Sequence, residues 1–399
     1  MVRRGQVLRR ALLRWPLAAA LGVAAAIRPA RSQQAAQEQA QGPAQSQSQS
    51  QSQSQAQGQA QTAAAITFDD TWVDGMRQRV LPLRVRLPAQ PLAGDPGCAL
   101  VLYSHGLGGS LAAGEVWARA WQAAGLAVIH LQHPGSDSEA ARGGLAALLG
   151  AANLAQLQAR VADVQFVLAE CARRAPVAPW SRLRLDAVGL AGHSFGAQTT
   201  LALAGARGNG PDLTDTAGKL RAFIALSPAP ARHGRLQLSQ QFGAITRPML
   251  CITGTLDGDP ISAGVQAAGA AAPLALRGAR GISPEDRRAV YDGLPSSAQG
   301  QRALLVLDQA DHASFAGQDL LAAVNGQPTR SPDGRPDGGR GRLLGQREPE
   351  TLRLQPLHHA RVAAISTDWW RAHLLADAAA QQRLRQPQGL EARDLWKRD

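Results

Sequence analysis

The sequence predicts an α/β protein in which helices cover both faces of a mostly parallel central sheet. Short apolar runs rich in Val, Leu and Ile alternate with longer helix-like stretches, a pattern typical of parallel strands joined by crossover helices. These runs are predominantly apolar, as expected for strands that are buried on both faces. The expected strands cover residues 99–103, 127–131, 185–191, 222–226, 249–253 and 303–307.

The first 32 residues have the three parts of an export signal. A basic stretch through Arg14 is followed by an apolar stretch over residues 16–27 and then by small residues. This apolar stretch of about twelve residues is too short to span a bilayer stably. Arg9-Arg10, before the apolar run, resembles a twin-arginine signal, with an ordinary arginine-rich secretory signal as the alternative. We therefore expect a periplasmic or secreted protein whose mature form begins near Gln33 and has no stable membrane span once the signal is removed.

Residues 33–64 differ in composition from the rest of the chain. They are rich in Gln, Ser and Ala, and they lack the apolar residues needed to offset the entropy of ordering a chain. We expect a disordered linker here. The folded domain should then cover residues 65–399, with a flexible insert near residues 325–350, where Gly, Arg, Pro and Asp are frequent.

Charge and cysteine content argue against several classes of protein. Of the formal net charge of +12, seven arginines before residue 33 contribute +7, so +5 remains without them. The remaining sequence has no basic run with interleaved aromatic residues, and we expect no nucleic-acid partner. Cys98, Cys171 and Cys251 are too few and too scattered for a disulfide framework or a zinc site.

Periodicity predicts three further elements. Residues 79–87 alternate over their second half and should form part of an antiparallel hairpin. Apolar side chains recur every three or four residues over 154–171, which predicts a helix between the second and third strands. A late helix near residues 362–379 carries Trp369 and Trp370, which we expect to be packing residues.

The strongest functional pattern is Gly192-His193-Ser194-Phe195-Gly196. It follows the expected strand at 185–191 directly and opens a helix-like stretch. A serine on such a sharp strand-to-helix turn is exposed at the edge of the sheet, and the two glycines let the backbone pack closely. This context predicts that Ser194 is a nucleophile.

A serine nucleophile needs a base that takes its proton and a carboxylate that holds the base. In folds with this turn the chain order is serine, acid, histidine, and the acid and the histidine each follow a later strand. Asp257 follows the strand at 249–253, and His312 follows the strand at 303–307. We therefore predict a triad of Ser194, Asp257 and His312, with Asp259 as the alternative acid.

A glycine-rich loop, His105-Gly106-Leu107-Gly108-Gly109, follows the first parallel strand. Attack on a carbonyl places negative charge on the former carbonyl oxygen. Two backbone N–H groups must stabilise this charge by donating hydrogen bonds to the oxygen. We assign these oxyanion donors to Leu107 and Phe195. The loop is not a phosphate-binding loop, because it lacks the Lys-Ser/Thr ending.

The other histidines fit the triad less well. His105, His130 and His133 lie at strand ends but precede Ser194 in the chain, and His193 should point its side chain away from the turn. No helical pair of His and Glu and no cluster of Cys and His suggests a metal site. We therefore expect neither a cofactor nor a metal.

Four segments together resemble the bacterial dienelactone-hydrolase-like and platelet-activating-factor-acetylhydrolase-like branch of the α/β-hydrolases. They are SHGLGGS at 104–110, HPGSD at 133–137, GHSFG at 192–196 and TGTLD at 253–257. The resemblance covers most of residues 79–380. It implies the α/β-hydrolase fold and a metal-independent esterase that acts on short or modest acyl groups, with the triad and oxyanion residues named above.

The chain departs from this branch in two ways. True dienelactone hydrolases have a cysteine where this chain has Ser194. The acetylhydrolases place their acid one strand earlier, where residues 225–232 of this chain offer no carboxylate. The substrate of neither group can therefore be assigned to this chain.

Three functional hypotheses follow. The first is an exported serine hydrolase that cleaves carboxylic esters, of small molecules or lipids, through an acyl-serine intermediate. The second is a cutinase-like hydrolase of polyesters or lipids, because cutinases also combine export, a serine turn and a Thr-Gly-rich acid loop. The third is an inactive hydrolase-fold binding protein, which is disfavoured because every residue that the mechanism requires is present.

Overall fold

The structure, a computed structural model, describes residues 64–399 except 144–146, 149, 209–218, 232–235, 260–280, 297–300 and 319–348. Residues 62–399 form one compact unit. The expected export signal, the expected linker up to residue 63 and most of the expected insert at 325–350 lie outside the described residues.

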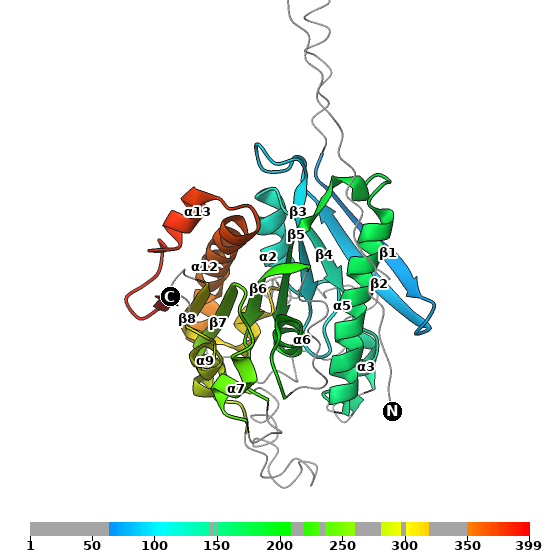
Figure 1. Ribbon diagram of the computed structural model, residues 1–399. Coiled ribbons are helices and arrows are strands. Elements are labelled where there is room, and N and C mark those ends of the chain that lie inside the picture. The colour runs from blue at the N-terminus through cyan, green and yellow to red at the C-terminus, as the bar shows by residue number, and fades with distance from the viewer. Residues whose placement is uncertain are drawn as a thin grey trace, which may run out of the picture. The chain divides into compact units, whose positions relative to one another are not determined.

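Within the described residues, nine strands form one sheet at the centre of the unit (Figure 1). Their order is β1-β2-β4-β3-β5-β6-β7-β8-β9. The strands are β1 (Ile66–Asp74), β2 (Arg79–Leu87), β3 (Cys98–Ser104), β4 (Ala127–Leu131), β5 (Leu183–His193), β6 (Leu220–Leu226), β7 (Met249–Leu256), β8 (Arg302–Asp311) and β9 (Leu395–Arg398). Strands β3 to β8 pair in parallel, whereas β1, β2 and β9 pair antiparallel at the edges. The six expected parallel strands and the hairpin are confirmed; β9 was not anticipated.

Helices cover both faces of this sheet (Figure 1). One layer contains α5 (Leu154–Arg174), α6 (Phe195–Ala204), α7 (Leu238–Phe242) and α9 (Pro284–Asp292). The other contains α2 (Glu115–Ala123), α12 (Pro349–Leu374) and α13 (Ala378–Arg383). The short helices α3 (Ser138–Arg142), η1 (Trp180–Arg182) and η5 (His312–Phe315) lie in connections. Trp369 and Trp370 of α12 are fully buried, which confirms their expected packing role.

The strands contribute side chains to two separate cores. In β3, Leu100 and Leu102 pack into the core beside α5 and α6, whereas Val101 and Tyr103 pack into the core beside α2 and α12. Every residue of β3 is buried. Because successive side chains of a strand point to opposite faces, a continuous apolar run supplies both cores at once.

The late helix is longer than the sequence predicted. It begins at Pro349 instead of near residue 362, and it ends at Leu374 instead of near residue 379. The chain leaves the helix through Ala376, whose φ of 54° is rare for a residue with a side chain. Asp377 then caps α13 by accepting hydrogen bonds from backbone N–H groups of its first turn.

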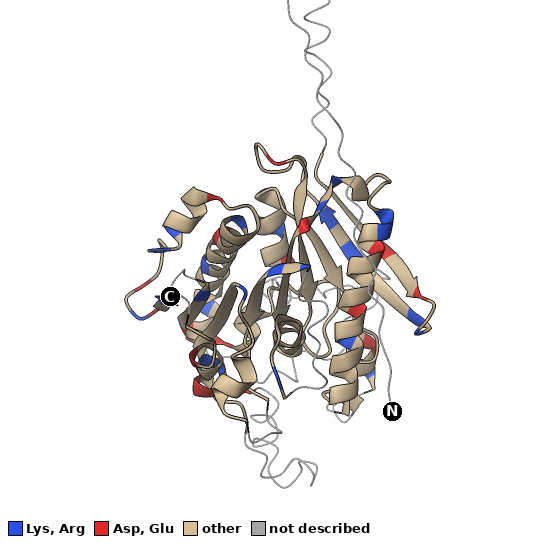
Figure 2. Cartoon of the chain, viewed as in Figure 1, with Lys and Arg blue, Asp and Glu red and all other residues tan. Residues whose placement is uncertain are grey.

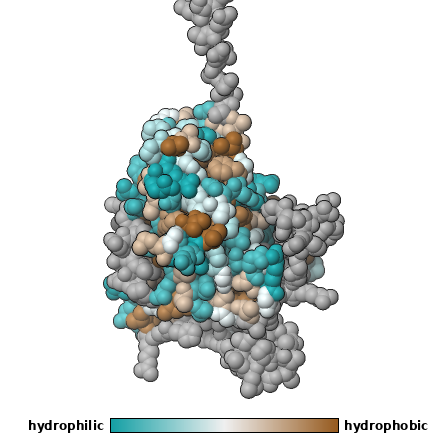
Figure 3. All heavy atoms as spheres, turned by 90° about the vertical axis from the view of Figure 1, so that its right-hand side faces the viewer, coloured by the Kyte–Doolittle hydropathy of each residue, from teal (hydrophilic) through white to brown (hydrophobic). Residues whose placement is uncertain are grey.

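The surface mixes charges and apolar residues. Both signs of charge occur on α5, on α9 and on the β1–β2 hairpin, while the central strands carry few charges (Figure 2). Small hydrophobic patches lie among hydrophilic residues on the face seen in Figure 3. In the part of the chain that the structure describes, no helix is long and apolar enough to cross a membrane.

All three cysteines are free thiols buried in the core. Burial raises the pKa of Cys171 and of Cys251 to about 12. These side chains therefore remain protonated at neutral pH and pack as small hydrophobic groups.

Candidate active site

Ser194 lies on the sharp turn between β5 and α6. Its φ of 56° and ψ of −113° fall outside the regions that residues with side chains normally adopt, so the turn stores backbone strain. Close packing explains the two flanking glycines. A Cβ at Gly192 would lie 2.2 Å from the carbonyl oxygen of Gly196, and one at Gly196 would lie 1.9 Å from that of Ser104. The turn thus presents Ser194, partly exposed, at the carboxyl edge of the parallel strands.

The three predicted triad residues meet at this edge. Ser194 Oγ lies 3.0 Å from His312 Nε2, and His312 Nδ1 lies 2.8 Å from Asp257 Oδ1. Ser194 follows β5, Asp257 follows β7 and His312 follows β8. Because the carboxylate accepts the hydrogen of Nδ1, the lone pair of Nε2 faces the serine hydroxyl. This arrangement can take a proton from Ser194.

Asp257 is a fully buried carboxylate with several donors around it. Thr253 Oγ1 donates to Asp257 Oδ2 at 2.7 Å, and Arg287 Nε lies 2.8 Å from Asp257 Oδ1. Burial raises the pKa of Asp257, but the charge of Arg287 and the hydrogen bond from His312 outweigh burial and hold this pKa below its ordinary value. Asp257 is therefore ionised at neutral pH.

Asp259, the alternative acid, lies two residues farther along the same loop. Its backbone N–H donates to the carbonyl oxygen of Ile282 at 2.8 Å. His312 Nδ1 donates its hydrogen bond to the carboxylate of Asp257. Of the two candidates, Asp257 is thus the one that the structure joins to the histidine.

The predicted oxyanion donors flank Ser194. Phe195 is the first residue of α6, where a backbone N–H has no partner within the helix. Leu107 follows Gly106, at which a Cβ would lie 3.4 Å from the Ser194 Cβ, so this loop passes directly beside the serine. Among the described residues, neither Leu107 nor Phe195 donates its backbone N–H to another group. Both are available to a ligand oxygen.

The expectation that His193 points away from the turn is wrong. The centres of the His193 and His312 rings are 4.7 Å apart, and His193 Nε2 donates to the backbone oxygen of His312 at 3.1 Å. The reason is strand alternation: His193 extends β5 on the same face as Ala191, which packs into the core beside α12. That is the face from which η5 approaches.

A second chain of hydrogen bonds, which sequence reasoning missed, lies beneath the glycine-rich loop. Ser104 Oγ lies 3.0 Å from His133 Nε2, and His133 Nδ1 lies 2.9 Å from Asp163 Oδ2. All three residues are fully buried. Arg79 forms a close ion pair with Asp163 at 2.6 Å. These contacts tie β2, the end of β3, the loop after β4 and α5 together.

Arg160 of α5 connects this buried network to the oxyanion loop. It is fully buried, and its Nη1 donates to the backbone oxygen of His105 at 2.7 Å. Its Nε donates to Ser136 Oγ at 2.8 Å, and the backbone oxygen of Ser136 accepts from Gly108 N–H at 2.8 Å. The guanidinium also stacks over the Phe195 ring at 4.5 Å. Arg160 therefore contacts the segments that carry both oxyanion donors.

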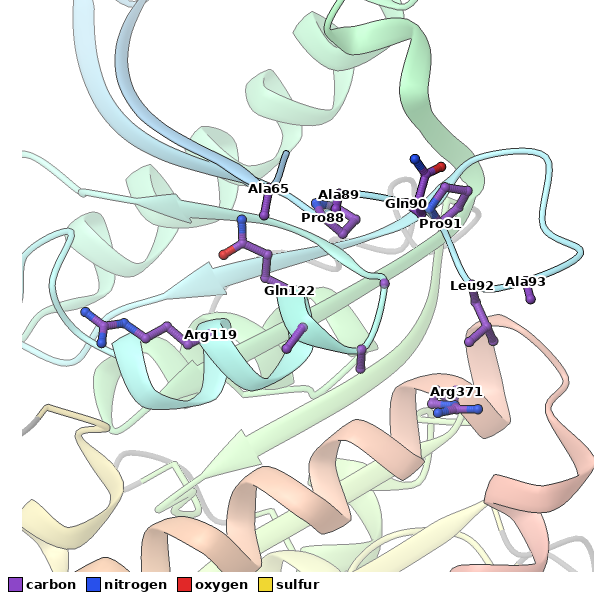
Figure 4. Close-up of a pocket in the computed structure, with 13 residues that line it drawn as sticks. Ala65, Pro88, Ala89, Gln90, Pro91, Leu92, Ala93, Arg119, Gln122 and Arg371 are labelled. Carbon is purple, nitrogen blue, oxygen red and sulfur yellow. The ribbon is translucent and has the colours of Figure 1, made fainter. Parts of the chain in front are cut away.

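A cavity of about 540 Å³ lies at the opposite edge of the sheet (Figure 4). It is lined by residues 88–93, by the end of α2 just before β4, and by Arg371 of α12. Its two arginines, Arg119 and Arg371, are ion-paired with Glu115 and Asp377. The lining offers no nucleophile and base side by side. Among the described residues, no group of three or more His, Cys, Asp or Glu side chains is arranged to hold a metal ion.

Comparison of the sequence with protein-family models and with curated proteins finds no match. The chemistry of the site itself therefore carries the functional argument.

Sequence reasoning also missed Arg287. The signal that could have placed it on a helix is the capping box that Ser283 and Asp286 form at the start of α9. Its contact with Asp257 depends on how α9 packs beside the end of β7, which no local pattern encodes.

Proposed function

We propose that this chain is an exported serine hydrolase with the α/β-hydrolase fold, which cleaves carboxylic esters through an acyl-serine intermediate. The observation that carries the proposal is the hydrogen-bonded chain from Ser194 through His312 to Asp257, with the serine held on a strained strand-to-helix turn. The order of the three residues and their positions after β5, β7 and β8 support the same conclusion.

Attack begins when an ester carbonyl lies next to Ser194 Oγ. His312 Nε2 accepts the hydroxyl proton as the oxygen bonds to the carbonyl carbon, and Asp257 stabilises the imidazolium that forms. The carbonyl oxygen becomes negatively charged and is met by the backbone N–H groups of Leu107 and Phe195. The positive end of the α6 dipole, at Phe195, adds to this stabilisation.

Two further stages complete the reaction, release of the alcohol and hydrolysis of the acyl-serine. His312 returns its proton to the departing alcohol, which leaves an ester between the acyl group and Ser194 Oγ. Water enters the position of the alcohol, His312 removes one of its protons, and the new hydroxyl attacks the acyl carbon. Breaking the bond to Ser194 Oγ with return of the proton to the serine releases the carboxylic acid and restores the site.

A fluorophosphonate probe tests the nucleophile directly. We expect labelling of the folded protein at Ser194, located by peptide mass mapping, together with hydrolysis of nitrophenyl esters of graded chain length. Ser194→Ala is the blank for both measurements. Labelling or turnover that persists unchanged in Ser194→Ala would overturn the proposal.

A further inference from the structure

Arg287 is a buried cation that contacts the acid of the triad and has no step in the mechanism above. It lies on α9, and its side chain is 3% exposed. Its Nε lies 2.8 Å from Asp257 Oδ1 and 2.6 Å from the backbone oxygen of Asp257. Its Nη1 donates to the backbone oxygen of Ser227, directly after β6, at 2.7 Å. One guanidinium thus ties α9 to the ends of two neighbouring strands.

This contact affects the base because both partners of Asp257 use the same carboxylate oxygen. His312 Nδ1 and Arg287 Nε each lie 2.8 Å from Oδ1. The carboxylate favours a positive charge on the imidazole, whereas the nearby guanidinium opposes it. The proton that His312 gains during attack therefore meets two opposing charges, both on buried side chains.

We propose that Arg287 is a positioning residue of the active site, which fixes the Asp257 carboxylate and offsets part of its charge. Replacing Arg287 by a neutral residue should therefore favour the positively charged form of His312. This inference rests on the proposed ester hydrolysis, because the pH dependence of that reaction is what reports the charge of His312.

The other titratable groups packed against His312 do not supply this offset. His193 of β5 is buried, and burial together with the charge of His312 holds the pKa of His193 well below its ordinary value, so its ring stays neutral. Asp311 of β8 caps η5 with its carboxylate. His358 of α12 donates to a backbone oxygen. Arg287 is the cation in direct contact with Asp257.

Arg287→Gln tests the role of the charge. We expect the acid limb of the pH profile of kcat, measured with a nitrophenyl ester, to move to higher pH by roughly one unit, the effect of one neighbouring charge. Arg302→Gln is the matched control. Arg302 also borders α9, where it stacks over Tyr291 at 4.9 Å, but its ion pair is with Asp399. The control should leave the limb in place. An unchanged limb in folded, active Arg287→Gln would overturn the proposal.

If circular dichroism shows that Arg287→Gln is unfolded, Arg287→Lys decides the question. Lysine keeps the charge but replaces the planar fork with a single amine, which cannot reach both strand ends. The acid limb should then stay in place while kcat falls roughly tenfold, because Asp257 is held less firmly. An unchanged kcat, or a limb that moves to higher pH, would overturn the proposal. Wild-type protein without ester turnover would instead contradict the proposed function.

Discussion

Two Ser-His-Asp arrangements with nearly the same geometry occur in the described part of this chain. We name them the outer triad, Ser194-His312-Asp257, and the inner triad, Ser104-His133-Asp163. The distance from serine oxygen to histidine nitrogen is 3.0 Å in both. The distance from histidine nitrogen to carboxylate oxygen is 2.8 Å in the outer triad and 2.9 Å in the inner one. Hydrogen-bond geometry alone would assign both the same chemistry.

Access and backbone conformation separate the two. Ser104 and His133 are 0% exposed, whereas Ser194 is partly exposed and the His312 side chain is 11% exposed. Ser104 ends β3 within the sheet, where it pairs with a residue of β4 and one of β5. Ser194 instead lies on a strained turn beside two backbone N–H groups that no described residue uses. Of these two serines, Ser194 is the one that is partly exposed to solvent.

The surroundings of the inner triad keep its histidine neutral. Burial and the charge of Arg160 lower the pKa of His133 to about 4. Burial raises the pKa of Asp163, but hydrogen bonds from His133 and Arg79 outweigh it and leave this pKa at about 2. The inner triad is therefore a neutral histidine beside a fixed anion, and its contacts hold the loops that carry the outer site.

The largest contrast should appear when each serine loses its hydroxyl. Ser194→Ala removes the nucleophile and should lower ester turnover by roughly a millionfold, the loss measured when a serine protease loses its serine. Ser104→Ala removes one buried hydrogen bond and should change turnover by less than about tenfold. Parallel assays with a nitrophenyl ester measure both. Comparable losses in the two variants would mean that the inner triad takes part in the chemistry.

Replacing the aspartate of each triad by asparagine should have different consequences, a loss of turnover in the outer triad and a loss of stability in the inner one. Asp257→Asn should lower kcat by about ten-thousandfold, because the amide favours the wrong tautomer of His312. Asp163→Asn should instead cost about 3 kcal/mol of the free energy of unfolding, because it leaves Arg79 without its buried anion. Steady-state kinetics and urea unfolding measure the two effects.

Asp259→Asn is the control for this pair of variants, since Asp259 neighbours Asp257 but the hydrogen bond to the histidine is made by Asp257. It should retain most of the ester turnover. If Asp259→Asn rather than Asp257→Asn lost most of the ester turnover, the acid of the outer triad would be Asp259.

Removing one oxyanion donor should have a smaller effect. Leu107→Pro has no backbone N–H and should lower kcat about a hundredfold to a thousandfold, whereas Leu107→Ala keeps the donor and should mainly change substrate fit. Circular dichroism establishes that both variants are folded. Equal losses of kcat in the two folded variants would contradict the role of this N–H group.

The sequence predicted those parts of the fold that follow from local patterns, such as apolar runs. Apolar runs identified the six parallel strands, and because parallel strands end at a common edge, the residues after β5, β7 and β8 could be expected to meet. The contact between His133 and Asp163 joins a strand end to the middle of a helix, and the contact between Asp257 and Arg287 joins the residue after β7 to helix α9. Such contacts depend on how helices rotate and pack on the sheet, which periodicity does not fix.

The smallest expected effect concerns the pH dependence of stability in the inner triad. His133 has a pKa of about 4 in the folded protein, against an ordinary value of 6.5. Between these two values the unfolded chain binds a proton at this residue that the folded protein does not. The contribution of His133 to the free energy of unfolding is therefore complete above pH 6.5 and is lost as pH falls toward 4.

We expect His133→Gln to reduce this pH dependence, because glutamine can still donate to Asp163 and accept from Ser104 but does not titrate. Between pH 7 and pH 5 the free energy of unfolding of the wild type should fall by about 2 kcal/mol more than that of His133→Gln, since one pKa unit corresponds to about 1.4 kcal/mol. Urea unfolding at the two pH values measures the difference. Ser104→Ala keeps the imidazole and should retain the wild-type dependence. A fall in His133→Gln as large as in the wild type would show that His133 takes up no proton on unfolding.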